Sequence, residues 1–257
     1  MKNRPILNVF ILSIFLCFEG CISNKEAEIT NELVIKPYRI ADQVNDSIFF
    51  GFIADMDADD SVILFLDHSN KRLIACDHQF NLINLIGRTG KGPGEFQYPS
   101  EVAIKNGVYL VRDNLEIKKY SRDGTFTGSI ETKTNLAATF SGELLHSQQL
   151  DEPIIAERYK KIVENLVNEP NGIGSLYNDI YLFKKQLYIL KTTRVNEKMF
   201  SYLLVWNISH GKITPAYRYE LRMNDEREPS FDKMCLLNDS ILVVSEMNTM
   251  SLYFFKL

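Results

Sequence analysis

The sequence predicts an all-β fold assembled from repeated units of short antiparallel strands. Three observations lead to this prediction. A glycine-rich stretch at 87–94 suits neither a helix nor a central strand. Apolar runs of strand length follow it between turn residues, and similar runs recur about 46 residues apart, from Asp67 to Asp113. One such unit cannot bury its own faces, so several units must pack together.

The clearest unit begins with the glycine-rich loop GRTGKGPG at 87–94, which predicts an ordered turn. Asn106 and Gly107 suit the positive φ angles of a tight hairpin turn. Asp123 and Gly124 turn the chain again. The strands expected between these turns are Glu101–Ile104, Val108–Val111, Glu116–Tyr120 and Phe126–Ile130.

This unit resembles an NHL repeat, a pattern in which a GxGPGEF loop and a proline precede hydrophobic strands and a closing Asp-Gly turn. The matching residues are Gly92, Pro93, Gly94, Glu95, Phe96, Pro99, Val102, Ala103, Ile104, Val108, Tyr109, Leu110, Val111, Asp113, Ile117, Tyr120, Asp123 and Gly124. The resemblance implies a β-propeller in which each repeat forms one four-stranded blade.

Weaker copies of the unit occur on both sides of it. The strand candidates are Val62–Asp67, Arg72–Cys76, Asp179–Phe183, Gln186–Leu190, Ser201–Trp206, Asp239–Val244 and Ser251–Phe255. Residues 35–257 resemble the six-bladed NHL-like or TolB-like propeller lipoproteins of Bacteroidetes-type bacteria. The repeat spacing allows about five units, whereas that family usually has six, so we expect a six-bladed or an incomplete six-bladed propeller. The chain ends on a strand, as is typical of a ring closed by its last blade.

One segment departs from the strand pattern. Apolar residues recur at helical spacing after Pro153, and Asn168 and Pro170 end the segment. We therefore expect a short helical insertion near 153–168. A surface helix covering a sheet edge is the simpler interpretation, and a functional lid or docking element is the alternative.

The N-terminus has the layout of an export signal. Lys2 and Arg4 precede an apolar run at 6–18, which is too short to span a bilayer as a stable helix. Gly20 and Cys21 then resemble a bacterial lipoprotein processing site. We expect a signal peptide at 1–20, a lipidated Cys21 with a polar tether at 21–34, and the propeller domain at 35–257. Plain secretion and an uncleaved anchor are the alternatives. The resemblance implies an outer-membrane lipoprotein of the cell envelope, facing the periplasm or the cell surface.

Composition indicates one globular domain after the signal, with 45% hydrophobic and 24% charged residues. The formal net charge of −4 argues against a nucleic-acid partner, which requires a concentrated basic patch. Cys76 and Cys235 each lie in an apolar run, which favours buried free thiols over a disulfide.

Three features of the sequence bear on its chemistry: the acids at 55–60, the histidines and the loop at 87–94. The acids at 55–60 superficially match a calcium loop, but Asp60 and Leu66 stand where Gly and Glu are required, so we expect an acidic turn between strands. The histidines follow no metal-binding spacing. The loop at 87–94 lacks the spacing of a phosphate loop. We therefore expect no cofactor, no metal and no catalytic residue.

The function expected from these features is that of a membrane-anchored, exported binding module for an envelope protein or an extracellular ligand, without catalysis. The alternative is a metal-dependent hydrolase or lyase with its site on the central axis. A binding face would include Arg88, Lys91, Tyr98 and Arg112, which flank the glycine-rich loop. Their simpler role is packing and solubility around that turn.

Overall fold

The computed structural model describes residues 32–131, 175–209, 212–225 and 227–257, and every regular element in these ranges is a strand. The strands are β1 (Glu32–Ile35), β2 (Arg39–Ala41), β3 (Gln43–Asn45), β4 (Ile48–Phe49), β5 (Ile53–Ala58), β6 (Ile63–Asp67), β7 (Arg72–Cys76), β8 (Leu82–Ile86), β9 (Pro99–Lys105), β10 (Val108–Asp113), β11 (Glu116–Tyr120), β12 (Phe126–Glu131), β13 (Ser175–Phe183), β14 (Gln186–Val195), β15 (Lys198–Ser209), β16 (Lys212–Leu221), β17 (Phe231–Asn238), β18 (Ile241–Glu246) and β19 (Ser251–Lys256). The helix expected near 153–168 lies outside the described residues. None of the described elements is a helix able to span a membrane.

The strands form four sheets of the expected kind. Strands β5–β8 and β9–β12 are two four-stranded antiparallel meanders. Strands β13–β16 form a third, and β1 is added in parallel to the outer strand β16. Strands β17–β19 form the fourth, which β2 completes. A small hairpin of β3 and β4 precedes β5.

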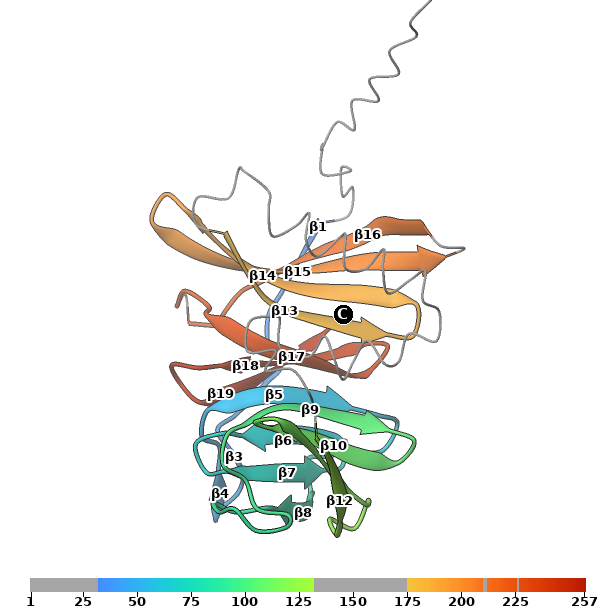
Figure 1. The fold of residues 1–257 in the computed structure, drawn as a ribbon. Coiled ribbons are helices and arrows are strands. Elements are labelled where there is room, and N and C mark those ends of the chain that lie inside the picture. Colours follow the sequence, from blue (N-terminus) through green and yellow to red (C-terminus); the bar gives the residue numbers. More distant parts are fainter. Residues whose placement is uncertain (1–31, 132–174, 210–211, 226) are drawn as a thin grey trace, which may run out of the picture.

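The first strands of the four sheets pack against one another, in the spatial order β9, β5, β17, β13. Figure 1 shows the sheets arranged one after another in this way. Neighbouring first strands run in the same direction, as two hydrogen bonds between β9 and β5 show. The backbone N–H of Val102 donates to Asp55, and that of Ile104, two residues later, donates to Asp57, also two residues later. Four-stranded meanders that meet through their first strands are the blades of a β-propeller, so the predicted fold class is confirmed.

The closing strand comes from the other end of the chain. Strand β2 pairs antiparallel with β19, with Ile40 opposite Tyr253. The last strand β19 therefore belongs to a sheet that an N-terminal strand completes, and closure of the ring stays a prediction. Four blades lie within the described residues, and the expected number of six stays a prediction because residues 132–174 fall between β12 and β13.

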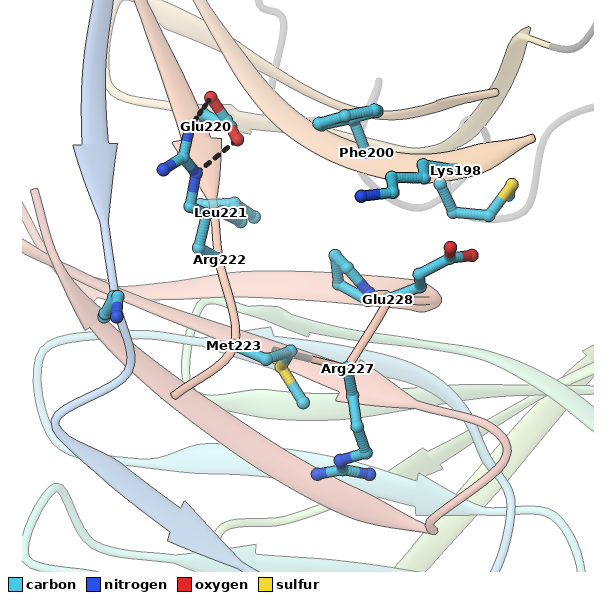
Figure 2. A pocket seen from close by; sticks show the side chains of 11 residues that line it. Lys198, Phe200, Glu220, Leu221, Arg222, Met223, Arg227 and Glu228 are labelled. Carbon is cyan, nitrogen blue, oxygen red and sulfur yellow. Dashed lines mark hydrogen bonds and ion pairs between the residues drawn. The ribbon is translucent and has the colours of Figure 1, made fainter. Parts of the chain in front are cut away.

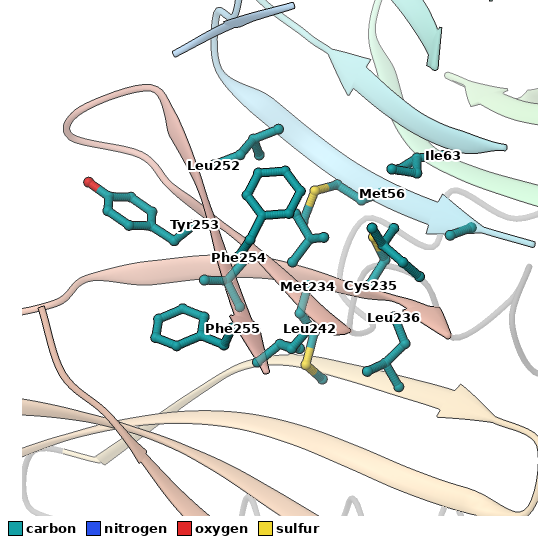
Figure 3. Packing of buried hydrophobic residues seen from close by; sticks show 14 of the residues in the cluster. Met56, Ile63, Met234, Cys235, Leu236, Leu242, Leu252, Tyr253, Phe254 and Phe255 are labelled. Atoms are coloured by element: carbon teal, nitrogen blue, oxygen red, sulfur yellow. The ribbon is translucent and has the colours of Figure 1, made fainter. Parts of the chain in front are cut away.

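The core fills the spaces between blades. The largest cluster joins the β5–β8 sheet to the β17–β19 sheet through side chains such as Met56, Ile63, Cys235 and Phe254 (Figure 3). Each such side chain contributes about 1.5–3 kcal/mol by leaving water. A second cluster, which includes Leu64 and Val102, joins the β5–β8 sheet to the β9–β12 sheet. The alternating faces of β5, β6 and β7 thus serve two neighbouring interfaces.

Local turn chemistry agrees with the sequence. Asn106 and Gly107 have φ angles of 50° and 75°, as the two-residue turn between β9 and β10 requires. Gly87 also has a positive φ, and a Cβ atom there would lie 2.2 Å from the Phe96 ring, which is fully buried. Glycine is therefore needed where the chain leaves β8.

Candidate functional site

The connectors between sheets lie at one end of the propeller, together with the turns between second and third strands. Because the first strands run parallel and the sheets are meanders, the turns between second and third strands lie at the same end as the connectors between sheets. We call this the connector end. Its segments are the turns 68–71, 114–115, 196–197 and 247–250 and the connectors 87–98 and 222–230, of which residue 226 lies outside the described part. The β14–β15 turn marks this end at the left of Figure 1.

A buried aspartate at the end of the second strand organises this end in two blades. Asp113 accepts from the backbone N–H of Tyr98 at 2.6 Å and from Lys118 Nζ at 2.6 Å. Asp67 accepts from the backbone N–H of Gly51 at 3.3 Å and from Arg72 Nε at 3.0 Å. In both blades the aspartate joins the incoming connector to a cation five residues later on the third strand. The connector backbone is therefore held in place.

The glycine-rich loop is fixed by its own glutamate. Glu95 accepts from the backbone N–H of Gly92 and from Arg88 Nε, each at 2.8 Å. These hydrogen bonds, from Gly92 first and then Arg88, hold the pKa of the Glu95 carboxyl below its usual value. A Cβ atom on Gly90 would lie 1.9 Å from the Glu95 carboxylate, so a side chain there would displace this carboxylate from its hydrogen bonds. The loop is an ordered surface feature.

The structure places three of the four residues of the expected binding face at the exposed connector end. Arg88 and Lys91 are exposed, and Tyr98 stands out from the loop with Lys71 Nζ 5.5 Å from its ring centroid. Arg112 is buried inside the β9–β12 sheet, where it donates to Glu101 at 3.1 Å. Glu101 lies directly opposite Arg112 in the β9–β10 register. We therefore assign Arg112 no surface role.

Further apolar side chains extend this surface. Exposed hydrophobic residues at the turns and connectors of this end are Tyr98, Leu115, Met247 and Met250, and Val195 is exposed at the end of β14. Arg88, Lys91 and Lys71 lie at the same end. Aromatic, methionine and arginine side chains are enriched where proteins contact each other. We call Tyr98, Leu115 and Met250 the apolar rim.

The first strands contain buried acids that the sequence analysis placed in a turn. Asp55 and Asp57 lie within β5 and are almost fully buried, so the expected acidic turn is wrong for these two residues. Asp59 and Asp60 do lie in the turn after β5. Asp55 and Asp57 are buried because adjacent first strands share no backbone hydrogen-bond ladder. A carboxylate on one first strand therefore accepts hydrogen bonds from the backbone N–H groups of the next.

The same arrangement recurs in a second pair of blades. Asp179 of β13 accepts from the backbone N–H of Met234 at 2.8 Å and lies 3.6 Å from Lys233 Nζ. Asp55, Glu101, Asp179 and Lys233 each follow an irregularity in the pairing of a first strand with its second strand. All four are buried, which places ionisable groups at one level around the axis.

A hydrogen bond crosses the centre of the molecule. Tyr181 of β13 donates to Asp57 of β5 at 2.7 Å, although β17 lies between these two strands in the ring. Burial, and then the Asp57 carboxylate, raise the pKa of the Tyr181 hydroxyl well above its usual value. No group of three or more His, Cys, Asp or Glu side chains among the described residues is arranged to hold a metal ion.

Cys76 and Cys235 are buried and form no disulfide, which confirms the prediction of free thiols. Burial first, and then the nearby Asp77 carboxylate, raise the pKa of Cys76 to about 12. Burial and three nearby aspartates raise that of Cys235 well above its usual value. Neither thiol has the lowered pKa of a nucleophile.

A pocket of about 440 Å³ opens between the β15–β16 strands and the connector 222–230 (Figure 2). Its lining comprises Lys36, Lys198, Met199, Phe200, Glu220, Leu221, Arg222, Met223, Arg227, Glu228 and Pro229. Four cations and five apolar side chains therefore meet at one opening. No local sequence pattern indicates this site, because its walls come from segments far apart in the chain.

Comparison with known proteins identifies no family for this chain. The sequence matches no known family profile and no curated protein. Among solved structures, a streptogramin B lyase has 10% identity, covers 85% of this chain and 97% of its own, and gives a TM-score of 0.42. A regucalcin from Agrobacterium tumefaciens, described as calcium-binding, has 8% identity with coverages of 87% and 95% and a TM-score of 0.36.

A third structure, a protein of Bacteroides fragilis provisionally described as exported, has 13% identity with coverages of 88% and 80% and a TM-score of 0.36. At such identities and TM-scores these likenesses decide nothing about activity or ligand. The fold assignment rests on the strand order and on the contacts between first strands.

Proposed function

We propose that this protein is an exported, lipid-anchored β-propeller lipoprotein of the NHL-like or TolB-like kind that binds an envelope protein through its connector end. The observation that carries the proposal is the collection of exposed apolar and cationic side chains at that end, where Asp67 and Asp113 hold the segments of two blades in place. A rigid end with apolar and cationic groups matches the surfaces that proteins use to recognise each other.

The buried acids support binding over catalysis. Asp55, Asp57 and Asp179 each accept a backbone N–H from a neighbouring first strand. These hydrogen bonds give the carboxylates a role in joining blades. A hydrolase or lyase with an axial metal would need such carboxylates as ligands, and metal coordination would compete with these contacts.

Replacement of Cys21 by Ser is expected to abolish lipid attachment and to move the protein from the membrane fraction to the soluble fraction. The reason is that buried acyl chains contribute about 0.8 kcal/mol per methylene, and no described element replaces them as an anchor. Incorporation of labelled palmitate and fractionation of cells measure the effect. Cys17→Ser is the matched control and is expected to change neither. Equal labelling of Cys21→Ser and wild type would disprove the anchor.

Substitution of the apolar rim is expected to abolish binding of the envelope protein partner. We compare Tyr98→Ala/Leu115→Ser/Met250→Ser with the matched control Ile83→Ser/Leu85→Ser/Ile130→Ser on the outer strands β8 and β12. The rim residues are 46–64% exposed and the control residues 44–49%, so both triple variants remove similar exposed apolar groups. Truncation of a hot-spot residue in an interface costs about 2 kcal/mol or more, so the loss of one hot spot among the three is enough for a clear effect.

The measurement is crosslinking on intact cells followed by mass spectrometry of the tagged protein. The expected result is one envelope protein captured stoichiometrically by wild type and by the outer-strand variant, and more than tenfold less by the rim variant. Equal capture by both triple variants would show that the connector end is not the binding face.

A further inference from the structure

The pocket at the connector end exists because one hairpin is longer than its neighbour. Residues 198–200 of β15 pair with β14, where Lys198 lies opposite Val195. Strand β16 ends at Leu221, opposite Ser201, so β15 continues beyond it. The connector 222–230 then turns away from the sheet and leaves an opening beneath the overhanging hairpin (Figure 2).

Hydrogen bonds hold the walls of this opening. The Arg222 N–H donates to the Ile35 carbonyl at 3.0 Å, next to Lys36. Asn224 donates to the Pro37 carbonyl at 3.1 Å, and the Ser201 hydroxyl donates to the Pro229 carbonyl at 3.3 Å. Three separate segments are thus tied together, and a site whose walls are fixed in advance loses little entropy when a ligand binds.

Only some of the charged residues that line the pocket form ion pairs. Arg222 makes hydrogen bonds of 2.5 and 3.1 Å to the Glu220 carboxylate, and Arg227 makes one of 2.5 Å to Asp225. Within the described part of the chain, Lys36, Lys198 and Glu228 have no ionic partner. Two unpaired cations against one unpaired acid leave a net positive charge at the opening, in a chain whose formal net charge is −4.

The remaining lining is apolar. Met199 and Phe200 come from the overhanging hairpin, Leu221 and Met223 from the end of β16, and Pro229 from the connector. Figure 2 shows Phe200 and Met223 on opposite sides of the opening. We propose that this pocket binds a small organic anion, a carboxylate carried on an apolar body, as a site separate from the protein-binding apolar rim. The volume of about 440 Å³ suits a small ligand.

The test is a calorimetric titration of the full-length protein with naphthylacetate, and with naphthylethanol as its neutral counterpart. We expect saturable binding of naphthylacetate and binding of naphthylethanol weaker by about tenfold, because the lysines attract only the anion. Lys198→Glu is expected to weaken naphthylacetate binding by about tenfold or more, and Glu228→Gln to strengthen it by about threefold.

Lys185→Glu is the matched control, because it changes the charge equally at the other end of the same sheet, in the β13–β14 turn. It is expected to leave binding unchanged. Absence of saturable binding, equal affinity for naphthylethanol, or equal losses in Lys198→Glu and Lys185→Glu would each overturn the proposal. Lys198 is exposed, so an unchanged melting temperature verifies that its variant folds. Partner capture in cells is measured separately, which distinguishes failure of this site from failure of the proposed function.

Discussion

Replacement of Asp57 by Ala is expected to destabilise the folded protein by about 3–5 kcal/mol, because it leaves several buried donors without their acceptor. Asp57 accepts from the Ile104 N–H at 2.7 Å, from the Ala58 N–H at 2.8 Å and from the Tyr181 hydroxyl at 2.7 Å. These contacts connect β5 with β9 on one side and with β13 across the centre. Asp57 is 1% exposed, so in the folded protein bulk solvent does not reach its carboxylate.

Chemical denaturation measures this loss as a shift of the unfolding midpoint. Asp60→Ala is the matched control, because Asp60 is exposed in the following turn, and it is expected to change stability by less than about 0.5 kcal/mol. Tyr181→Phe removes one donor and tests the crossing contact. The double variant Asp57→Ala/Tyr181→Phe measures the coupling between the two side chains. If its loss of stability equalled the sum of the losses in the two single variants, the side chains would not be coupled.

Replacement of Lys233 by Met is expected to cost about 3–5 kcal/mol of stability, because it removes the cation from a buried ion pair. Lys233 is 7% exposed, and its Nζ lies 3.6 Å from the Asp179 carboxylate. Burial disfavours the charged ammonium, but Asp179, Asp55 and Asp232 outweigh burial and hold the pKa of Lys233 above its usual value. Without Lys233 the Asp179 carboxylate would be buried without its cation.

The pH dependence of stability distinguishes this cause from a simple packing defect. A raised lysine pKa contributes stability that is fully present below the usual value of 10.5 and is lost as pH rises through the raised value. In Lys233→Met, protonation removes the unpaired charge of the buried Asp179 carboxylate. The difference in stability between this variant and wild type is therefore expected to shrink as pH falls. Denaturation at several pH values measures this difference, with Lys185→Met as the exposed control. A difference that did not change with pH would contradict the electrostatic cause.

The local part of the fold could be predicted from the sequence. The meander β9–β12 follows from turn residues with positive φ, such as Asn106 and Gly107, and from apolar runs of strand length. The strands β18 and β19 near the C-terminus were also predicted, but no strand was predicted at the positions of β1 and β2. The partners of these strands were not predicted either, because β2 pairs with β19 and β1 with β16 across more than two-thirds of the chain. No local pattern encodes such pairs.

The candidate site was predicted only in part, for the same physical reason. Exposed polar and aromatic residues beside a rigid loop identified Arg88, Lys91 and Tyr98. Arg112 was included because its partner Glu101 lies on another strand, and Asp55 and Asp57 were placed in a turn because their acceptor role depends on a neighbouring blade. Alternation of Asp with Ala and Met over 54–58 was the one signal that could have indicated a strand.

The pairing of β2 with β19 also sets the order in which the molecule can assemble. Residues 39–41 leave the ribosome long before residues 252–254, their partners in the finished sheet. The last blade therefore lacks both β19 and the paired β2 until β19 has been made, while the β5–β8 and β9–β12 sheets already have all their strands. A chain interrupted before β19 leaves β2 as an unpaired strand. The last blade can thus be completed only after β19 has been made.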